Sequence, residues 1–153
     1  MFISYSWHAA FVPLAAAIRR RNPSATDFFW IDIFNVAQLR HTEQAAELNK
    51  ADVGRFAGAI EASNAVVWLH LQPWHCPVTF RRVWCLSEVV TSIDKARGFE
   101  VMLADEEERE LQTTLSERFD MVLEVLSSID AEKAQATHAS DKEMIMGMIR
   151  TRP

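Results

Sequence analysis

The sequence predicts an α/β domain in which a parallel sheet of about five strands lies between two layers of helices. Three observations lead to this fold class. Short apolar runs alternate with amphipathic helical patterns, which is typical of successive β-α-β units. The apolar runs are nearly continuous, as in parallel strands that are buried on both faces. Clusters of proline and polar residues separate the runs, and we expect the three-layer, flavodoxin-like arrangement of strands.

The first half of the chain supplies two predicted strands and two predicted helices. FISY at 2–5 is short and apolar, as in a buried strand, and apolar residues over 11–18 recur at helical spacing. FFWIDIF at 28–34 is predicted to form the second strand. The mostly polar stretch 35–52 is expected to be a long loop with a short helix. A second amphipathic helix follows over 53–60.

The second half begins with the third strand. AVVWLHL at 65–71 is apolar almost throughout, and QPWHCP at 72–77 must be a loop because it holds two prolines. The next helix is expected from about 83 to Gly98, where glycine favours a stop. FEVMLA at 99–104 is the fourth predicted strand.

Capping patterns and one weak apolar stretch complete the predicted elements. Asp105 and Glu108 have the spacing of a capping box at a helix start, and Ser140 and Glu143 repeat it before a terminal helix. A short fifth strand is predicted near Ile129. Ligands of parallel sheets bind beyond the carboxyl ends of the strands, so the segments that follow the strands are the first places to look for a site.

Composition excludes several classes of function. The chain has 153 residues with 49% hydrophobic side chains, which fits one globular domain spanning 1–153. Its apolar opening, MFISYSW, favours a module cut from a longer protein. The net charge of −5 argues against nucleic acid and against a membrane surface as partners. Only two cysteines and no secretory pattern favour a cytoplasmic location.

The segment RRVWCLSEVV contains an unusual pair of side chains. On a helical wheel the predicted core face consists of Val83, Leu86, Val90 and Ile93. Trp84 and Glu88 fall about 40° from each other and well over 100° from the centre of that face. An aromatic ring one turn from a carboxylate would suit a flat, partly cationic ligand ring. The competing interpretation of Glu88 alone is a solvated helix residue.

Three segments resemble one known family. FISYS at the first strand, WIDIF at the second and PWHCPVTFRRVWCLSEV resemble TIR domains, most closely those with a WCLxE helix, as in plants. The resemblance extends from Phe2 to about Val90 and is weaker after Phe99. It implies a single TIR-like domain.

The resemblance also implies an activity and a set of residues. Many TIR domains hydrolyse NAD+ to release nicotinamide, and the glutamate of the helix motif is their catalytic residue, which is Glu88 in this sequence. The positions that match the family's substrate pocket are Trp84, Tyr5, Ser6, Trp7 and Asp32. NAD+ is then a substrate rather than a cofactor, and homo-oligomers form through TIR–TIR contacts.

The chain departs from the family in two places. Some relatives have basic residues after the first strand, where this chain has Ser6 and Trp7, so Arg40, Arg81, Arg82 or backbone N–H groups would have to hold the pyrophosphate. The loop after the second strand is longer than usual. Two alternatives therefore stay open: a non-enzymatic TIR-type self-association module, and another N-glycoside hydrolase or nucleoside ribosyltransferase.

Histidines and cysteines near the third strand do not form a metal motif. His70, His75, Cys76 and Cys85 lie close in the sequence, but their spacing matches no closed zinc pattern. His75 and Cys76 are adjacent, which does not make them face each other as a nucleophile pair would. We expect no metal site from these residues.

Overall fold

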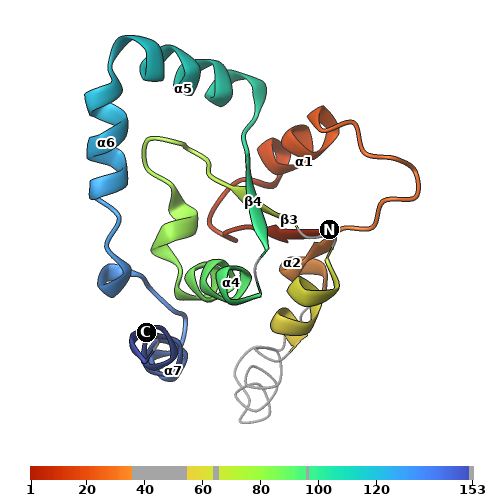
Figure 1. The fold of residues 1–153 in the computed structure, drawn as a ribbon, viewed down its shortest axis with the longest axis vertical. Coiled ribbons are helices and arrows are strands. Elements are labelled where there is room, and N and C mark those ends of the chain that lie inside the picture. Colours follow the sequence, from red (N-terminus) through yellow and green to blue (C-terminus); the bar gives the residue numbers. More distant parts are fainter. Residues whose placement is uncertain (36–54, 64–65, 96, 152–153) are drawn as a thin grey trace.

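The fold is an α/β sandwich, described from a computed structural model over residues 1–35, 55–63, 66–95 and 97–151 (Figure 1). Its four strands are β1 (Phe2–Ser4), β2 (Trp30–Ile31), β3 (Val66–His70) and β4 (Gly98–Met102). They pair in the order β2-β1-β3-β4, and every pairing is parallel. This confirms the α/β class and is compatible with a flavodoxin-like order, with four strands in the described residues instead of about five.

Helices connect and flank these strands. The helices with defined bounds are α1 (Phe11–Arg20), α2 (Asp32–Asn35), α4 (Val83–Asp94), α5 (Asp105–Glu117), α6 (Phe119–Ser127) and α7 (Ala139–Arg150). Residues 55–62 are also helical. Two short 3-10 turns, η1 (Val78–Arg81) and η2 (Ala131–Lys133), precede α4 and α7. No helix in the described ranges is both long enough and apolar enough to cross a membrane.

The two faces of the sheet have separate apolar cores because side chains alternate along β1. Ile3 packs with Leu14 of α1 in the core on one face. Phe2 packs with Ile60 of the helix at 55–62 in the core on the other face. The sheet therefore lies between helical layers, as the continuous apolar strands predicted.

The second strand is shorter than predicted. Only Trp30 and Ile31 pair with β1, and the chain turns into α2 at Asp32. The Asp32 carboxylate accepts the N–H of Ile33 at 2.7 Å, and Asn35 Nδ2 donates to the carbonyl of Ile31 at 2.7 Å. These short-range hydrogen bonds stabilise a helical turn where apolar residues alone predicted strand.

The prediction of a fifth strand near Ile129 was wrong. The apolar residues before it recur at helical spacing and form α6, and Ile129 follows the end of that helix. The nearest strand-like contact is an isolated bridge between Arg82 and Gln135, outside the sheet. Among the described strands, β4 is therefore an edge of the sheet.

The predicted helix ends were partly wrong. α4 ends at Asp94, before Gly98, which belongs to β4. α5 does begin at Asp105, but its N-cap is Ala104, which offers no side-chain cap. The N-cap of α7 is likewise His138 without a side-chain hydrogen bond. Neither predicted capping box is formed, because each helix begins earlier than the box requires.

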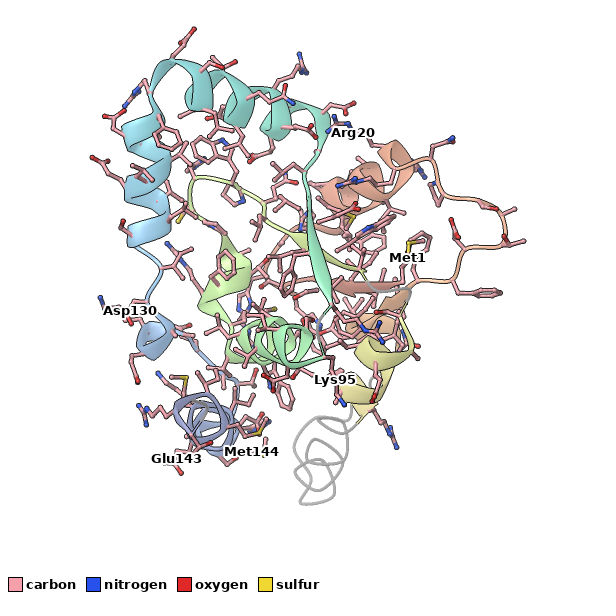
Figure 2. All side chains as sticks on the ribbon, in the orientation of Figure 1. Met1, Arg20, Lys95, Asp130, Glu143 and Met144 are labelled. Carbon is pink, nitrogen blue, oxygen red and sulfur yellow. The ribbon has the colours of Figure 1, made fainter. Side chains whose placement is uncertain are left out.

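Ion pairs at the surface join α1 to α5. Arg20 at the end of α1 extends toward the start of α5 (Figure 2), and its Nε lies 2.9 Å from Asp105. It also pairs with Glu108. The predicted loop at 35–52 lies, apart from its first residue, outside the described residues.

Candidate functional site

Helix α4 is buried on two sides. Val83 and Leu86 pack with Ile145 and Met146 of α7. Cys85 and Glu88 face β1 instead, where Cys85 Sγ donates to the carbonyl of Tyr5 at 3.7 Å. Helix α4 therefore lies between α7 and the sheet, and side chains on two of its faces are buried.

The predicted core face of α4 was wrong in two respects. Ile93, assigned to the core, is 62% exposed. Glu88, assigned to the surface side, is only 3% exposed. The helical wheel assigned the buried side from the apolar residues alone. The side of α4 that faces the sheet is instead lined by Cys85, Glu88 and Ser92, which are buried although two of them are polar. A buried polar side was therefore mistaken for a solvated one.

Among the described residues, one side chain forms a hydrogen bond with the carboxyl of Glu88. Ser4 Oγ, from the middle of the sheet, donates to Glu88 Oε2 at 2.5 Å, and both residues are buried. No cation in the described residues forms an ion pair with this carboxyl. Burial raises the pKa of Glu88 well above its ordinary value, and the charge of Asp32 raises it further, while the Ser4 hydrogen bond opposes the shift.

Asp32 is the second carboxyl of the site. It lies where β2 ends, and Trp7 Nε1 donates to its Oδ2 at 2.6 Å. Burial raises the pKa of Asp32 to about 6, although the hydrogen bonds from Trp7 and Ile33 and the charge of Arg82 act in the opposite direction. Glu88 and Asp32 come from distant parts of the chain and act electrostatically on each other.

The predicted residues after β1 have different surroundings. Tyr5 is 3% exposed, and its hydroxyl donates to the carbonyl of Ala9. Burial raises the pKa of Tyr5, with a smaller contribution from Asp32. Ser6 is 1% exposed and closes the turn, because its carbonyl accepts the N–H of Ala9 at 2.8 Å. Trp7 is 45% exposed, so its aromatic ring is accessible to solvent at the site.

Trp84 does not share the environment of Glu88. Its ring packs edge-on against Phe56 with a centroid distance of 5.5 Å. It also borders the apolar cluster that α4 forms with α7. The structure brings Tyr5, Asp32 and Glu88 together with Trp7, and it places Trp84 against the helix at 55–62.

The sequence interpretation gave Ser4 no role and did not place Cys85 or Arg82 beside the two carboxyls. Ser4 binds Glu88, and Cys85 lies beside it with a pKa raised by burial and by the charges of Glu88 and Asp32. Arg82 is near enough to Asp32 to lower its pKa. The signal for Ser4 was a polar side chain in an apolar strand, on the same face as Phe2. The sequence analysis considered Arg82 for the pyrophosphate and Cys85 as a metal ligand, and neither residue type signalled contact with the carboxyls.

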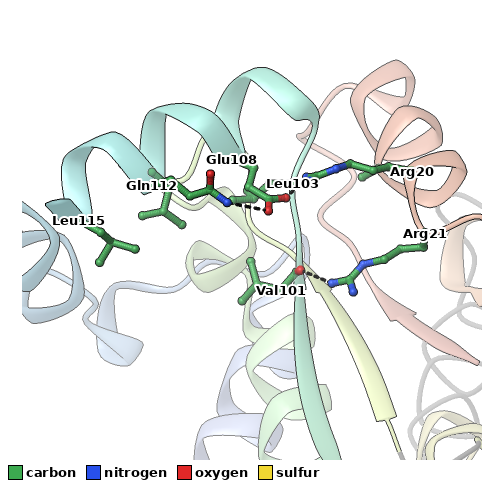
Figure 3. Close-up of a pocket in the computed structure, with 9 residues that line it drawn as sticks. Arg20, Arg21, Val101, Leu103, Glu108, Gln112 and Leu115 are labelled. Carbon is green, nitrogen blue, oxygen red and sulfur yellow. Dashed lines mark hydrogen bonds and ion pairs between the residues drawn. The ribbon is translucent and has the colours of Figure 1, made fainter.

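A separate cavity lies between α1, β4 and α5 (Figure 3). Its volume is about 450 Å³, and its lining includes Val101, Leu103 and Leu115. At its rim Arg20 pairs with Glu108, and Arg21 Nη2 donates to the backbone carbonyl of Val101 at 2.8 Å. None of the predicted site residues lines this cavity.

The four candidate zinc ligands point to different partners. His70 is fully buried, and its ring lies 5.7 Å from that of Tyr5. Cys76 Sγ accepts a hydrogen bond from Arg81 at 2.6 Å, and Cys85 faces the carbonyl of Tyr5. A different trio in the described residues, His75, Glu107 and Glu110, gathers donor atoms suited to a metal ion.

Comparison with known proteins adds no relative. No family model matches the chain, no curated protein matches it, and no solved structure matches it.

Proposed function

We propose that the chain is a TIR-like NAD+ glycohydrolase that acts in signalling or defence in the cytoplasm. The observation that carries this proposal is the pair of carboxyls, Glu88 and Asp32, which influence each other electrostatically and have no ion-paired cation among the described residues. Burying a carboxyl without a cation costs stability, and such perturbed groups concentrate at functional sites. The resemblance of WCLSE to the helix motif of TIR domains supplies the substrate class.

The chemistry of the reaction fits a carboxylate in this position. Cleavage of the ribosyl–nicotinamide bond develops positive charge on the ribose, as in glycoside cleavage. In this proposal ionised Glu88 stabilises that charge or captures the sugar. Nicotinamide leaves as a neutral molecule, so no second group has to protonate it.

Access to Glu88 involves Trp7 and Asp32. Trp7 is the exposed aromatic side chain of the site, and its indole N–H holds the Asp32 carboxyl. In the proposal the nicotinamide ring stacks on Trp7 and displaces that hydrogen bond. The cationic ring then approaches both carboxyls, which lowers their pKa values and leaves Glu88 ionised for the reaction.

A self-association module without activity is the first competing function. The observation in its favour is a row of exposed apolar side chains on α5 and α6, namely Leu115, Phe119, Leu123 and Leu126, between 42% and 57% exposed. Such a surface suits protein contacts. In this alternative Glu88 and Ser4 only fix α4 against the sheet.

A nucleoside enzyme is the second competing function. Two of the basic residues considered for the pyrophosphate have partners within the protein, because Arg81 donates to Cys76 and Arg82 donates to Thr137 at 3.3 Å. Arg40 lies outside the described residues. A site without a basic group to bind phosphate would favour a ribosyl substrate that lacks the pyrophosphate.

One assay separates the three functions. The purified chain at high concentration is incubated with NAD+ or with nicotinamide riboside, and free nicotinamide is measured. Faster release from NAD+ supports the proposal, and faster release from the riboside supports the nucleoside enzyme. No release from either substrate at any protein concentration contradicts cleavage of NAD+ and of its nucleoside, and favours the self-association module.

A further inference from the structure

Three metal-ligating side chains meet outside the carboxyl site. His75 lies in the loop that follows β3, while Glu107 and Glu110 lie three residues apart on α5. One donor atom from each lies within 4.8 Å of the other two. We propose that these three residues bind a divalent transition-metal ion such as Zn²⁺.

Two of the three ligands are anchored on a buried residue. Trp74 is 4% exposed, and its backbone N–H donates to Glu107 Oε2 at 2.8 Å. Its ring packs edge-on against the ring of His75, with a centroid distance of 5.8 Å and an interplanar angle of 86°. His75 and Glu110 are exposed, so small side-chain rotations bring the donor atoms to the roughly 2.0–2.2 Å that zinc requires.

The charges around the trio favour a cation. Asp105 and Glu108, on the same turns of α5, both pair with Arg20. No described basic side chain pairs with Glu107 or Glu110. Among the described residues, the two carboxylates therefore have no cationic side chain paired with them. A bound ion would supply the missing positive charge.

The donor set selects a class of metal. One imidazole nitrogen and two carboxylate oxygens suit zinc and neighbouring first-row ions, whereas calcium and magnesium prefer oxygen ligands alone. Three protein ligands also leave a coordination position open for water. The adjacent thiol of Cys76 already accepts a hydrogen bond from Arg81, so it is not part of the proposed ligand set. This proposal does not depend on the activity of Glu88.

Calorimetric titration of the whole chain with Zn²⁺ tests the site. We expect one ion per chain, and we expect Glu110→Gln and His75→Ala to weaken binding at least about tenfold, because loss of even a supporting group costs about 10–100-fold. The matched control is Glu106→Gln, an exposed acid of the same helix outside the trio, which should bind as the wild type does. Circular dichroism checks that each variant is folded.

Cobalt substitution identifies the ligands independently. Co²⁺ in the wild type should give visible bands of nitrogen and oxygen coordination without a thiolate charge-transfer band, and Cys76→Ser should not change them. Wild-type protein that binds no Zn²⁺, or folded Glu110→Gln that binds it equally well, would overturn the proposal. A thiolate band that disappears in Cys76→Ser would overturn the ligand set in the same way.

Discussion

At the scale of single residues, the carboxyl of Glu88 is the most unusual group of the protein. It is buried between α4 and β1 with a serine as its hydrogen-bond donor. An isolated ion in such a place is unfavourable, so burial favours the neutral form of this carboxyl and raises its pKa. The sequence identified Glu88 through its motif, but it did not predict the burial, because a helical wheel contains no information on what faces each side.

The raised pKa of Glu88 predicts a dependence of stability on pH. Above pH 4.5, the ordinary pKa of a glutamate, the unfolded chain releases the proton of Glu88 while the folded protein still binds it. The contribution of this group to stability therefore falls as the pH rises from 4.5 toward the raised pKa. Glu88→Gln does not titrate. Its stability relative to the wild type should therefore increase from pH 5 to pH 8, as measured by urea unfolding. The same difference at both pH values would contradict this.

His70 predicts the opposite dependence. Burial lowers its pKa from 6.5 to about 4, so the unfolded chain takes up the proton first as pH falls. The contribution of neutral His70 to the free energy of unfolding is fully present above about pH 6.5 and is lost as the pH falls toward 4. At about 1.4 kcal/mol per pH unit, the loss is roughly 3 kcal/mol. Urea unfolding of the wild type and of His70→Leu across this range measures it. A constant difference between the two proteins would contradict the assignment.

At the scale of elements, α4 links the site to the rest of the fold. One of its sides packs on α7 through Leu86, and another packs on β1 through Glu88. Ile93 is exposed although it continues the apolar spacing. Apolar periodicity predicted the existence and approximate length of the helix. It failed for the orientation, because the neighbours of α4 come from residues far away in the sequence.

Paired substitutions in α4 test this orientation. Leu86→Ala should destabilise the protein by about 2–5 kcal/mol, since it leaves a cavity between α4 and α7. Ile93→Ala should change stability by no more than about 0.5 kcal/mol, because this side chain is exposed. Thermal or urea unfolding gives both values. Equal destabilisation by the two substitutions would mean that α4 is rotated relative to the structure.

The strands show where sequence patterns are sufficient and where they fail. β3 was predicted closely, because the nearly continuous apolar run AVVWLHL is too short for most helices and ends at a loop with two prolines. β2 was overestimated, since hydrogen bonds from Asp32 and Asn35 start a helix within the apolar run. The strand near Ile129 was wrong because this residue follows the end of α6, and the chain then turns into η2.

At the scale of the whole molecule, the sheet brings distant residues to one end. Asp32 follows β2 and Trp7 follows β1, and parallel pairing of these strands places the two side chains in hydrogen-bonding distance. The general position of the site was predictable from this rule for parallel sheets. The partners Ser4 and Arg82 depend on packing between layers, which the sequence does not specify.

The exposed apolar row on α5 and α6 leads to a prediction about assembly. The resemblance to TIR domains implies that copies of the chain associate, and the exposed row is a surface that could take part. If they do associate, nicotinamide release per molecule should rise with protein concentration. A dilution series with parallel light-scattering measurements tests this. Specific activity that stays constant across the range in a monomeric sample would contradict it.

The central claim is that the carboxylate of Glu88 carries out the cleavage of NAD+. The most direct test compares the initial rate of nicotinamide release by the wild type, by Glu88→Gln and by Leu86→Ala, each corrected for its folded fraction. We expect Glu88→Gln to be slower by about 10²–10³, the usual loss for one electrostatic group in a transition state. Leu86→Ala, which keeps the carboxyl, should retain the wild-type rate per folded molecule. An active wild type with an equally active Glu88→Gln would contradict the claim.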